Sequence, residues 1–125
     1  MAAQHASLAA GRWQTLSLVE QLANVGSEVA RVRRWQGKDT ALCVRASVRA
    51  FELLALTIGD PRWRRRLKEL TRVRECLCDA MTGGQEYGNT LESLDRYFLA
   101  FAVAARIGRA NVSQSTGGEA NRESH

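Results

Sequence analysis

The residues of this chain that are best suited to bind another molecule lie in one basic segment, DPRWRRRLKELTRVRE at positions 60–75. Residues 61–75 hold six arginines and one lysine against two glutamates, so the segment carries +5, as large as the net charge of +5 of the whole chain. Arginine makes bidentate contacts with phosphate or carboxylate that lysine cannot make. The segment therefore predicts an anion-binding surface, although a genomic bias toward arginine codons would also enrich this residue.

The candidate binding residues are the cations that would form the first two turns of a helix beginning at Pro61, with one later arginine in support. They are Arg62, Arg64, Arg65, Arg66 and Lys68, with Arg72. Later arginines can pair with Glu69 or Glu75 at helical spacing, but the first two turns contain no acid. Their counter-ion could be Asp60 at the helix cap, a carboxylate of another helix or subunit, or a nucleic-acid phosphate. Trp63 could stack on an exposed base or cover the end of the core.

The sequence contains few residues suited to metal binding or catalysis. The only histidines are His5 and His125, and neither follows a glutamate at the Glu-x-x-His spacing of a di-iron site. The three cysteines have no histidine nearby in the sequence, so neither a nucleophile–base pair nor an arginine–histidine pair is expected. We read the cysteines as reduced thiols and predict no metal, no cofactor and no enzymatic activity.

The composition predicts a single all-α domain. A chain of 125 residues with 45% hydrophobic and 25% charged residues is long enough to bury one core. One proline and few aromatic residues argue against a fold of many short strands. The sequence has no run of eighteen apolar residues and no leader-like N-terminus, so we expect neither a membrane span nor a signal peptide, and a cytoplasmic protein.

The first half of the chain predicts two helices. Ser17 and Glu20 have the spacing of a capping box, so a helix should begin at about Leu18 and end before Gly37. Its apolar seam is Leu18, Leu22, Val25, Val29 and Val32. Small residues beside that seam should let a neighbouring helix approach closely. A second helix should follow over residues 40–58, with Leu42, Ala46, Ala50, Leu53, Leu54 and Thr57 facing inward.

The second half predicts two more helices. Asp60 as N-cap and Pro61 at the first helical position should open a third helix that continues to about Met81. Its inward residues would be Leu67, Leu70, Val73, Leu77 and Met81. Asn89 and Glu92 should cap a fourth helix that ends at Gly108, with Leu91, Leu94, Phe98, Phe101 and Ala105 facing inward.

Short connections between four long helices predict an antiparallel up-down-up-down four-helix bundle. We expect residues 1–14 to form a lead-in that packs Trp13 on the body, residues 15–109 to form the bundle, and residues 110–125 to be a disordered tail. The basic segment, Arg106 and Arg109 should share one end. Arg31, Arg33 and Arg34 should lie at the other end.

Three stretches of the chain resemble a group of small bacterial helical proteins. They are LSLVEQLANVGSEVARVRRW, FELLALTIGDPRWRRRLKELTRVRE and YFLAFAVAAR, within residues 12–109. The group comprises the proteins encoded in intervening sequences of 23S ribosomal RNA genes and the accessory variability determinant proteins of diversity-generating retroelements. The resemblance implies a four-helix bundle that assembles into a homopentamer, binds RNA or DNA through a basic surface and, in the retroelement case, binds a reverse transcriptase. It implies no catalytic residues.

We therefore expect a non-enzymatic, homo-oligomeric accessory protein that binds nucleic acid. The alternative is a protein-interaction module whose arginine-rich end pairs with acidic residues of a partner or a neighbouring subunit. An enzyme or toxin with an active site assembled between subunits is a weaker third interpretation.

Overall fold

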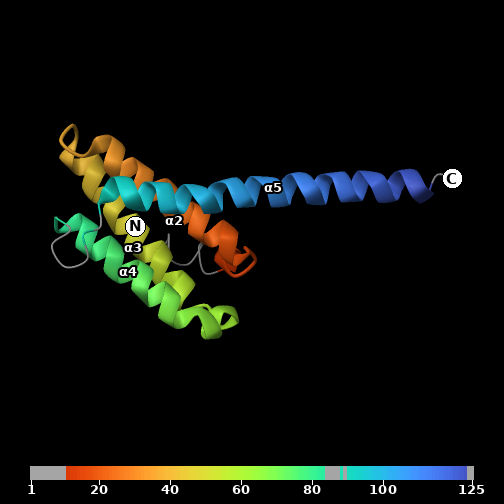
Figure 1. The fold of residues 1–125 in the computed structure, drawn as a ribbon, viewed down its shortest axis with the longest axis horizontal. Coiled ribbons are helices and arrows are strands. Elements are labelled where there is room, and N and C mark those ends of the chain that lie inside the picture. The colour runs from red at the N-terminus through yellow and green to blue at the C-terminus, as the bar shows by residue number, and fades with distance from the viewer. Residues whose placement is uncertain (1–10, 84–87, 89, 124–125) are drawn as a thin grey trace.

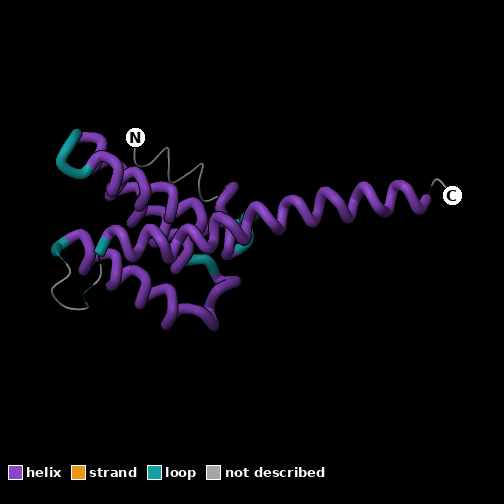
Figure 2. Tube along the Cα trace, turned by 45° about the horizontal axis from the view of Figure 1, so that its top comes forward, coloured by secondary structure: helices purple, strands orange, loops and turns teal. Residues whose placement is uncertain are grey.

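The computed structural model describes residues 11–83, 88 and 90–123, with side chains described as far as residue 108. Its helices are α2 (Leu18–Trp35), α3 (Thr40–Ile58), the short 3₁₀ helix η1 (Pro61–Arg66), α4 (Leu67–Met81) and α5 (Leu91–Glu123) (Figures 1 and 2). Residues 11–13 are helical as well, and the described part of the chain contains no strand. The predicted all-α class is confirmed.

The predicted starts of the first two long helices are confirmed by their caps. At the start of α2, the Ser17 hydroxyl accepts a hydrogen bond from the Glu20 backbone, and the Glu20 carboxylate accepts one from the Ser17 backbone, both at 3.1 Å. At the start of α3, the Asp39 carboxylate accepts from the Leu42 N–H at 3.1 Å. Gly37 lies between them with a φ of 75°, a left-handed conformation that reverses the chain and that glycine adopts without strain.

The helices pack with α2 at the centre of the contacts. α2 lies against both α3 and α5, and α4 makes smaller contacts with the same two helices. The main core contains the buried side chains of Trp13, Leu22, Val25, Val29, Ala50, Leu53, Leu54, Leu70, Val73, Leu77, Leu94 and Phe98. Most of these residues belong to the predicted seams. Trp13 is buried in this core, as expected, whereas residues 1–10 of the predicted lead-in lie outside the described residues.

Gly26 explains how α2 and α5 come so close. A Cβ atom added at this glycine would lie 2.5 Å from the Cβ of Phe98, a distance that no relaxed structure tolerates. Phe98 is itself almost fully buried. The prediction that small residues on α2 admit a neighbouring helix is confirmed, and the neighbour is α5.

The third predicted helix is not continuous from Pro61. The chain forms η1 first, with Trp63 at φ −103° and ψ 22°, and the α-helix begins only at Leu67. Asp60 caps this turn by accepting from the Arg62 N–H at 3.0 Å. Leu67, the first residue of α4, faces solvent rather than the core, whereas Leu70, Val73 and Leu77 are buried as predicted.

The fourth helix does not end at Gly108 as predicted. α5 continues through this glycine to Glu123, beyond the predicted end of the helix. One glycine inside a helix costs only about 1 kcal/mol, so it need not stop one. Asn89, the predicted cap, lies outside the described residues, but Thr90 and Ser93 exchange hydrogen bonds between side chain and backbone at 3.0 and 3.1 Å.

Candidate functional site

Arg62 has its counter-ion inside the molecule. Its Nη2 donates to the Asp60 carboxylate at 2.7 Å and its Nε donates to the same group at 3.1 Å. A second bond from Nη2 reaches the Leu16 carbonyl at 2.7 Å. The expectation that the first two turns hold only unpaired cations is therefore wrong for Arg62, and Asp60, one of the three counter-ions considered, is its partner.

Asp60 lies at the centre of a buried polar cluster, which we call the Asp60 cluster: Trp13, Gln21, Thr57, Asp60, Arg62 and Trp63. The Asp60 side chain is only 1% exposed. Its carboxylate accepts from Arg62 and, at 3.1 Å, from Gln21 Nε2. The hydrogen bonds from Arg62, with a smaller contribution from the Gln21 bond, together lower the pKa of Asp60 to about 2 against the opposing effect of burial.

The same cluster fastens the N-terminal segment to the packed helices. Gln21 Nε2 donates to the Trp13 carbonyl at 2.8 Å, and the Trp13 indole N–H donates to the Thr57 hydroxyl at 3.1 Å. Sequence reasoning missed Gln21, although a signal exists. It stands three residues after Leu18 and four before Val25, on the apolar face, where a polar side chain indicates a buried hydrogen bond.

Trp63 is held by two contacts that favour its role in covering the core. Its indole N–H donates to Gln21 Oε1 at 2.8 Å, and the Arg62 guanidinium lies 4.4 Å from the ring centroid. The ring is half-buried and packs against the main core. A base could reach this ring only by displacing the arginine that covers it.

Arg66 is also paired locally. Its Nε donates to the Glu69 carboxylate at 2.9 Å, and its Nη2 donates to the other oxygen at 3.2 Å. Sequence spacing allowed Glu69 to pair with later arginines, whereas the structure pairs this acid with Arg66, three residues before it.

The remaining predicted cations form an exposed group at the start of α4. Arg64, Arg65 and Lys68 are exposed and make no ion pair with the residues that the structure describes. Arg72 is exposed on the next turn of α4. A shallow groove of about 750 Å³ runs among these side chains and is lined by Arg65, Arg66, Leu67, Lys68, Glu69, Thr71, Arg72 and Glu75. We call Arg64, Arg65, Lys68 and Arg72 the α4 basic surface.

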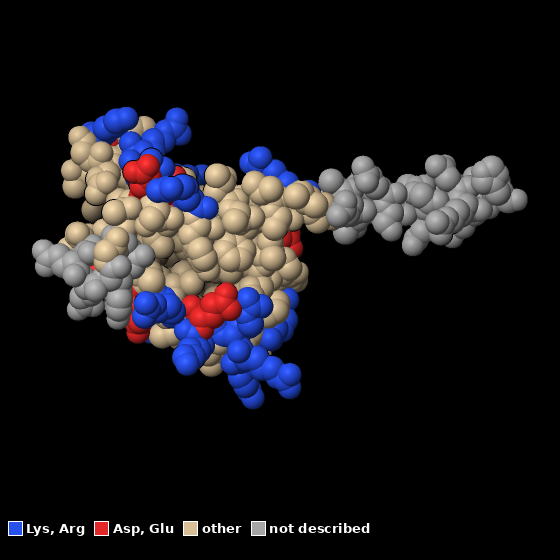
Figure 3. Space-filling view, in the orientation of Figure 1, with Lys and Arg blue, Asp and Glu red and all other residues tan. Residues whose placement is uncertain are grey.

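A second basic group lies where α2 ends, and acids neutralise more of it. Figure 3 shows basic side chains both there and along the lower edge of the molecule, where η1 and α4 lie in Figure 1. Arg31 binds Glu28 at 2.8 Å, and Arg33 binds Asp95 at 2.9 Å. Arg34 instead lies 5.7 Å from the centroid of the Trp35 ring. The α4 basic surface is therefore the better candidate for an external anion.

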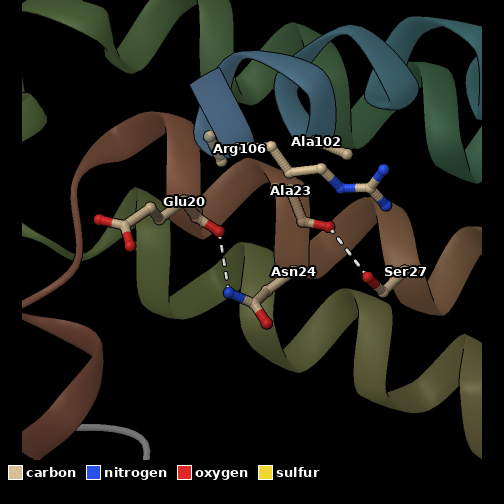
Figure 4. A pocket seen from close by; sticks show the side chains of 7 residues that line it. Glu20, Ala23, Asn24, Ser27, Ala102 and Arg106 are labelled. Atoms are coloured by element: carbon tan, nitrogen blue, oxygen red, sulfur yellow. Dashed lines mark hydrogen bonds between the residues drawn. The ribbon is translucent and has the colours of Figure 1, made fainter. Parts of the chain in front are cut away.

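A small pocket lies between α2 and α5, close to the end where α2 begins (Figure 4). It encloses about 200 Å³ and is lined by Glu20, Ala23, Asn24, Ser27, Ala102, Ala105 and Arg106. Its polar groups are largely occupied, since the Asn24 amide donates to the Glu20 carbonyl and the Ser27 hydroxyl donates to the Ala23 carbonyl. Arg106 thus lies at the same end as Arg62, as predicted, whereas the side chain of Arg109 is outside the described part of the chain.

Within the described residues, no group of three or more histidine, cysteine or acidic side chains could hold a metal ion. Cys43, Cys76 and Cys78 form no disulfide with one another. None of the helices in the described part of the chain is both long and apolar enough to cross a membrane.

Comparison with known proteins found no matching family model, no similar curated protein and no similar solved structure. The case for a function therefore depends on the geometry and charge of the surfaces described above.

Proposed function

We propose that this protein is a non-enzymatic accessory protein that binds nucleic-acid phosphates through the α4 basic surface. The observation that carries the proposal is the distribution of acids around the arginine-rich segment. Arg62 and Arg66 have intramolecular carboxylates, whereas Arg64, Arg65 and Lys68 are exposed and make no ion pair with the described residues. Arg65 and Lys68 also line an open groove. Phosphates placed in this groove would meet several cations at once.

Arginine density favours a polyanion over a single carboxylate as the ligand. Arg64, Arg65 and Lys68 all lie within five consecutive residues, so their charges repel one another unless several anions approach together. A nucleic-acid strand supplies such a row of charges, and release of its condensed counterions adds to the affinity. Acidic residues of a partner protein are the alternative ligand, and the binding experiment below separates the two.

We further propose that the helices form an antiparallel up-down-up-down four-helix bundle that associates with copies of itself in the cytoplasm. The support for self-association is an apolar stripe on α5, where the exposed residues Leu99, Val103 and Ile107 recur every four residues. Such a stripe on the outside of a packed helix is suited to another helix of the same kind. Several copies would multiply the α4 basic surface. The resemblance to retroelement proteins adds a reverse transcriptase as a proposed partner.

The proposal is tested by measuring the affinity for single-stranded RNA, single-stranded DNA and duplex DNA across a salt series. Three to four phosphate contacts on a single strand give a slope of about −2 to −3 in log K against log [salt]. Affinity should therefore fall about 20- to 50-fold between roughly 50 and 200 mM salt. Absence of detectable binding to any of the three at low salt refutes the proposal.

A charge-reversal variant with a matched control locates the binding surface. Arg64→Glu/Arg65→Glu lowers the net charge from +5 to +1, because each substitution removes two positive charges. Lys38→Glu/Arg45→Glu makes the same change with exposed cations near the end where α2 meets α3. The first variant should lose most of the affinity and salt dependence and the second should keep most of both. Equal losses would show that net charge alone attracts the ligand.

Self-association is tested separately by sedimentation. Leu99→Glu/Val103→Glu places charges on the exposed α5 stripe without touching the core, so the helix content should be unchanged and the assembly should dissociate to monomers. A wild-type protein that sediments as a monomer at all accessible concentrations contradicts the proposed oligomer but leaves the proposed phosphate binding intact.

A further inference from the structure

α3 carries a row of apolar residues on its outer face. Val44 and Val48 are 54% and 51% exposed, and Ala41 and Ala55 are exposed as well. These four residues are three, four and seven positions apart, so they lie in one row along the helix, opposite the residues that α3 buries in the core. We call them the α3 row. Apolar side chains thus cover a face that is usually polar on a helix of a monomeric protein.

The α5 stripe of Leu99, Val103 and Ile107 is a second apolar surface of the same molecule, with side chains between 47% and 58% exposed. α3 and α5 both pack on α2, but the α3 row and the α5 stripe face solvent, so neither covers the other within one chain. Each copy of the protein therefore exposes two apolar surfaces. The α3 row consists of small side chains, whereas the α5 stripe contains larger ones.

The two surfaces match when α3 of one copy runs antiparallel to α5 of another copy. Both rows advance by three or four residues per helical turn, so a register that aligns one pair of residues also aligns the next. The facing pairs are Val48 with Leu99, Val44 with Val103, and Ala41 with Ile107. The larger side chains of α5 then meet the smaller ones of α3, which lets the two helices approach closely.

Two charged residues fit the same register. Glu52 of α3 falls opposite Arg96 of α5, one turn beyond the pair of Val48 and Leu99. Neither Glu52 nor Arg96 makes an ion pair with the described residues of its own chain. Arg49, three residues before Glu52, lies 3.8 Å from Glu28 instead. The register therefore joins an acid and a base that both lack a partner within the described chain.

A contact between two α5 stripes does not give Arg96 such a partner. In a parallel arrangement Arg96 of one copy would face Arg96 of the other. In an antiparallel arrangement centred on Val103 it would face residue 110, which is an alanine. The charges therefore favour α3, rather than a second α5, as the surface that the α5 stripe contacts.

We propose that the α3 row of one copy binds the α5 stripe of a second copy, antiparallel and with an ion pair between Glu52 and Arg96. This contact rests on the self-association proposed above but does not depend on phosphate binding. Because the two surfaces differ, each copy binds one neighbour through α3 and another through α5, in a head-to-tail arrangement. The main competitor is a two-fold contact between α3 rows, in which Arg45 of each copy would face Glu52 of the other.

Mixing two assembly-deficient variants tests the head-to-tail contact. Val44→Glu/Val48→Glu blocks the α3 row and keeps the α5 stripe, whereas Leu99→Glu/Val103→Glu does the reverse. In sedimentation velocity each variant alone should be a monomer. An equimolar mixture should contain a species of two chains, because the intact stripe of the first variant binds the intact row of the second. Circular dichroism checks that both keep the helix content of wild type.

The other outcomes of this experiment contradict the contact. If either variant alone still assembles, a contact between identical surfaces is present and the head-to-tail arrangement is wrong. If the mixture stays monomeric, the α3 row and the α5 stripe do not bind each other, although the self-association of wild type stands. If wild type itself is a monomer, the proposed self-association and this contact fail together, and the phosphate-binding measurement is unaffected.

A charge exchange decides the matter even if one of the apolar variants does not fold. Glu52→Arg and Arg96→Glu should each weaken the self-association of the full chain about 5- to 20-fold, and the double variant should recover most of the loss. Arg45→Glu is the matched control for Arg96→Glu and should assemble like wild type. Weaker assembly of Arg45→Glu with no effect of Arg96→Glu would instead show the two-fold contact between α3 rows and overturn the proposal.

Discussion

Replacing Asp60 by asparagine tests whether the Asp60 cluster stabilises the fold. The carboxylate accepts five hydrogen bonds, four from Arg62 and one from Gln21. An asparagine side chain has one acceptor oxygen, and its NH₂ group would face donors. Asp60→Asn therefore removes the negative charge and leaves donors of Arg62 and Gln21 without an acceptor, while the size of the side chain hardly changes.

The expected magnitude follows from the pKa of Asp60, which the folded protein lowers from 3.8 to about 2. Each unit is equivalent to about 1.36 kcal/mol, so the shift corresponds to about 2 kcal/mol, and solvent around the partly exposed Arg62 reduces this to about 1–2 kcal/mol. The lost neutral hydrogen bonds add about 1 kcal/mol. We expect Asp60→Asn to lower the free energy of unfolding by about 2–3 kcal/mol at pH 7.

The pH dependence has a definite sign. Because folding lowers the pKa of Asp60, its electrostatic contribution is complete above the unfolded pKa of 3.8 and disappears as the pH falls through about 2. The difference between wild type and Asp60→Asn should therefore shrink as the pH is lowered from 5 to 2, leaving about 1 kcal/mol from the neutral hydrogen bonds.

Urea unfolding followed by circular dichroism, at a series of pH values, measures this difference. Asp39→Asn is the matched control, because Asp39 caps α3 and asparagine caps a helix about as well as aspartate. We expect the control to lie within about 0.5 kcal/mol of wild type. An Asp60→Asn variant as stable as the control at pH 7, or a difference that does not change with pH, would refute the reasoning.

Two further predictions concern contacts elsewhere in the core. Gly26→Ala places a methyl group 2.5 Å from the Cβ of Phe98, so we expect α2 and α5 to separate and thermal unfolding to show a loss of about 1–3 kcal/mol. In the control, Gly108→Ala, the added methyl group meets no atom within 4 Å and should stabilise the helix by up to about 1 kcal/mol. If Gly26→Ala changed the stability as Gly108→Ala does, the close approach of α2 and α5 would be excluded. Trp63→Phe removes the indole N–H that binds Gln21, and urea titration should show a loss of about 1–3 kcal/mol. A neutral result would mean that water replaces this bond.

Much of the helical structure could be predicted because it depends on short-range patterns. A capping box needs only Ser17 and Glu20 at the right spacing, and the buried seams repeat every three or four residues. The cap at Asp39 is equally local. In each case the hydrogen bonds and the buried face involve residues within one or two turns of the chain, so the sequence contains the information directly.

The candidate site was predicted less well, because several of the hydrogen bonds around it reach other elements. The sequence identified the basic segment and named Asp60 as one of several counter-ions. It did not show that Arg62 would also reach the Leu16 carbonyl or that Trp63 would bind Gln21.

The sequence by itself determined the all-α class, the starts of α2 and α3 and most of the buried seams. The tertiary structure decided the surroundings of Asp60, the counter-ion of Arg62. Arg62 and Arg66 meet carboxylates only two and three residues away in the chain, whereas Arg64 and Arg65 face solvent. Charge, helical period and these short-range pairs are encoded locally, but only the packing buries Asp60 and brings to it the amide of Gln21, 39 residues away in the chain.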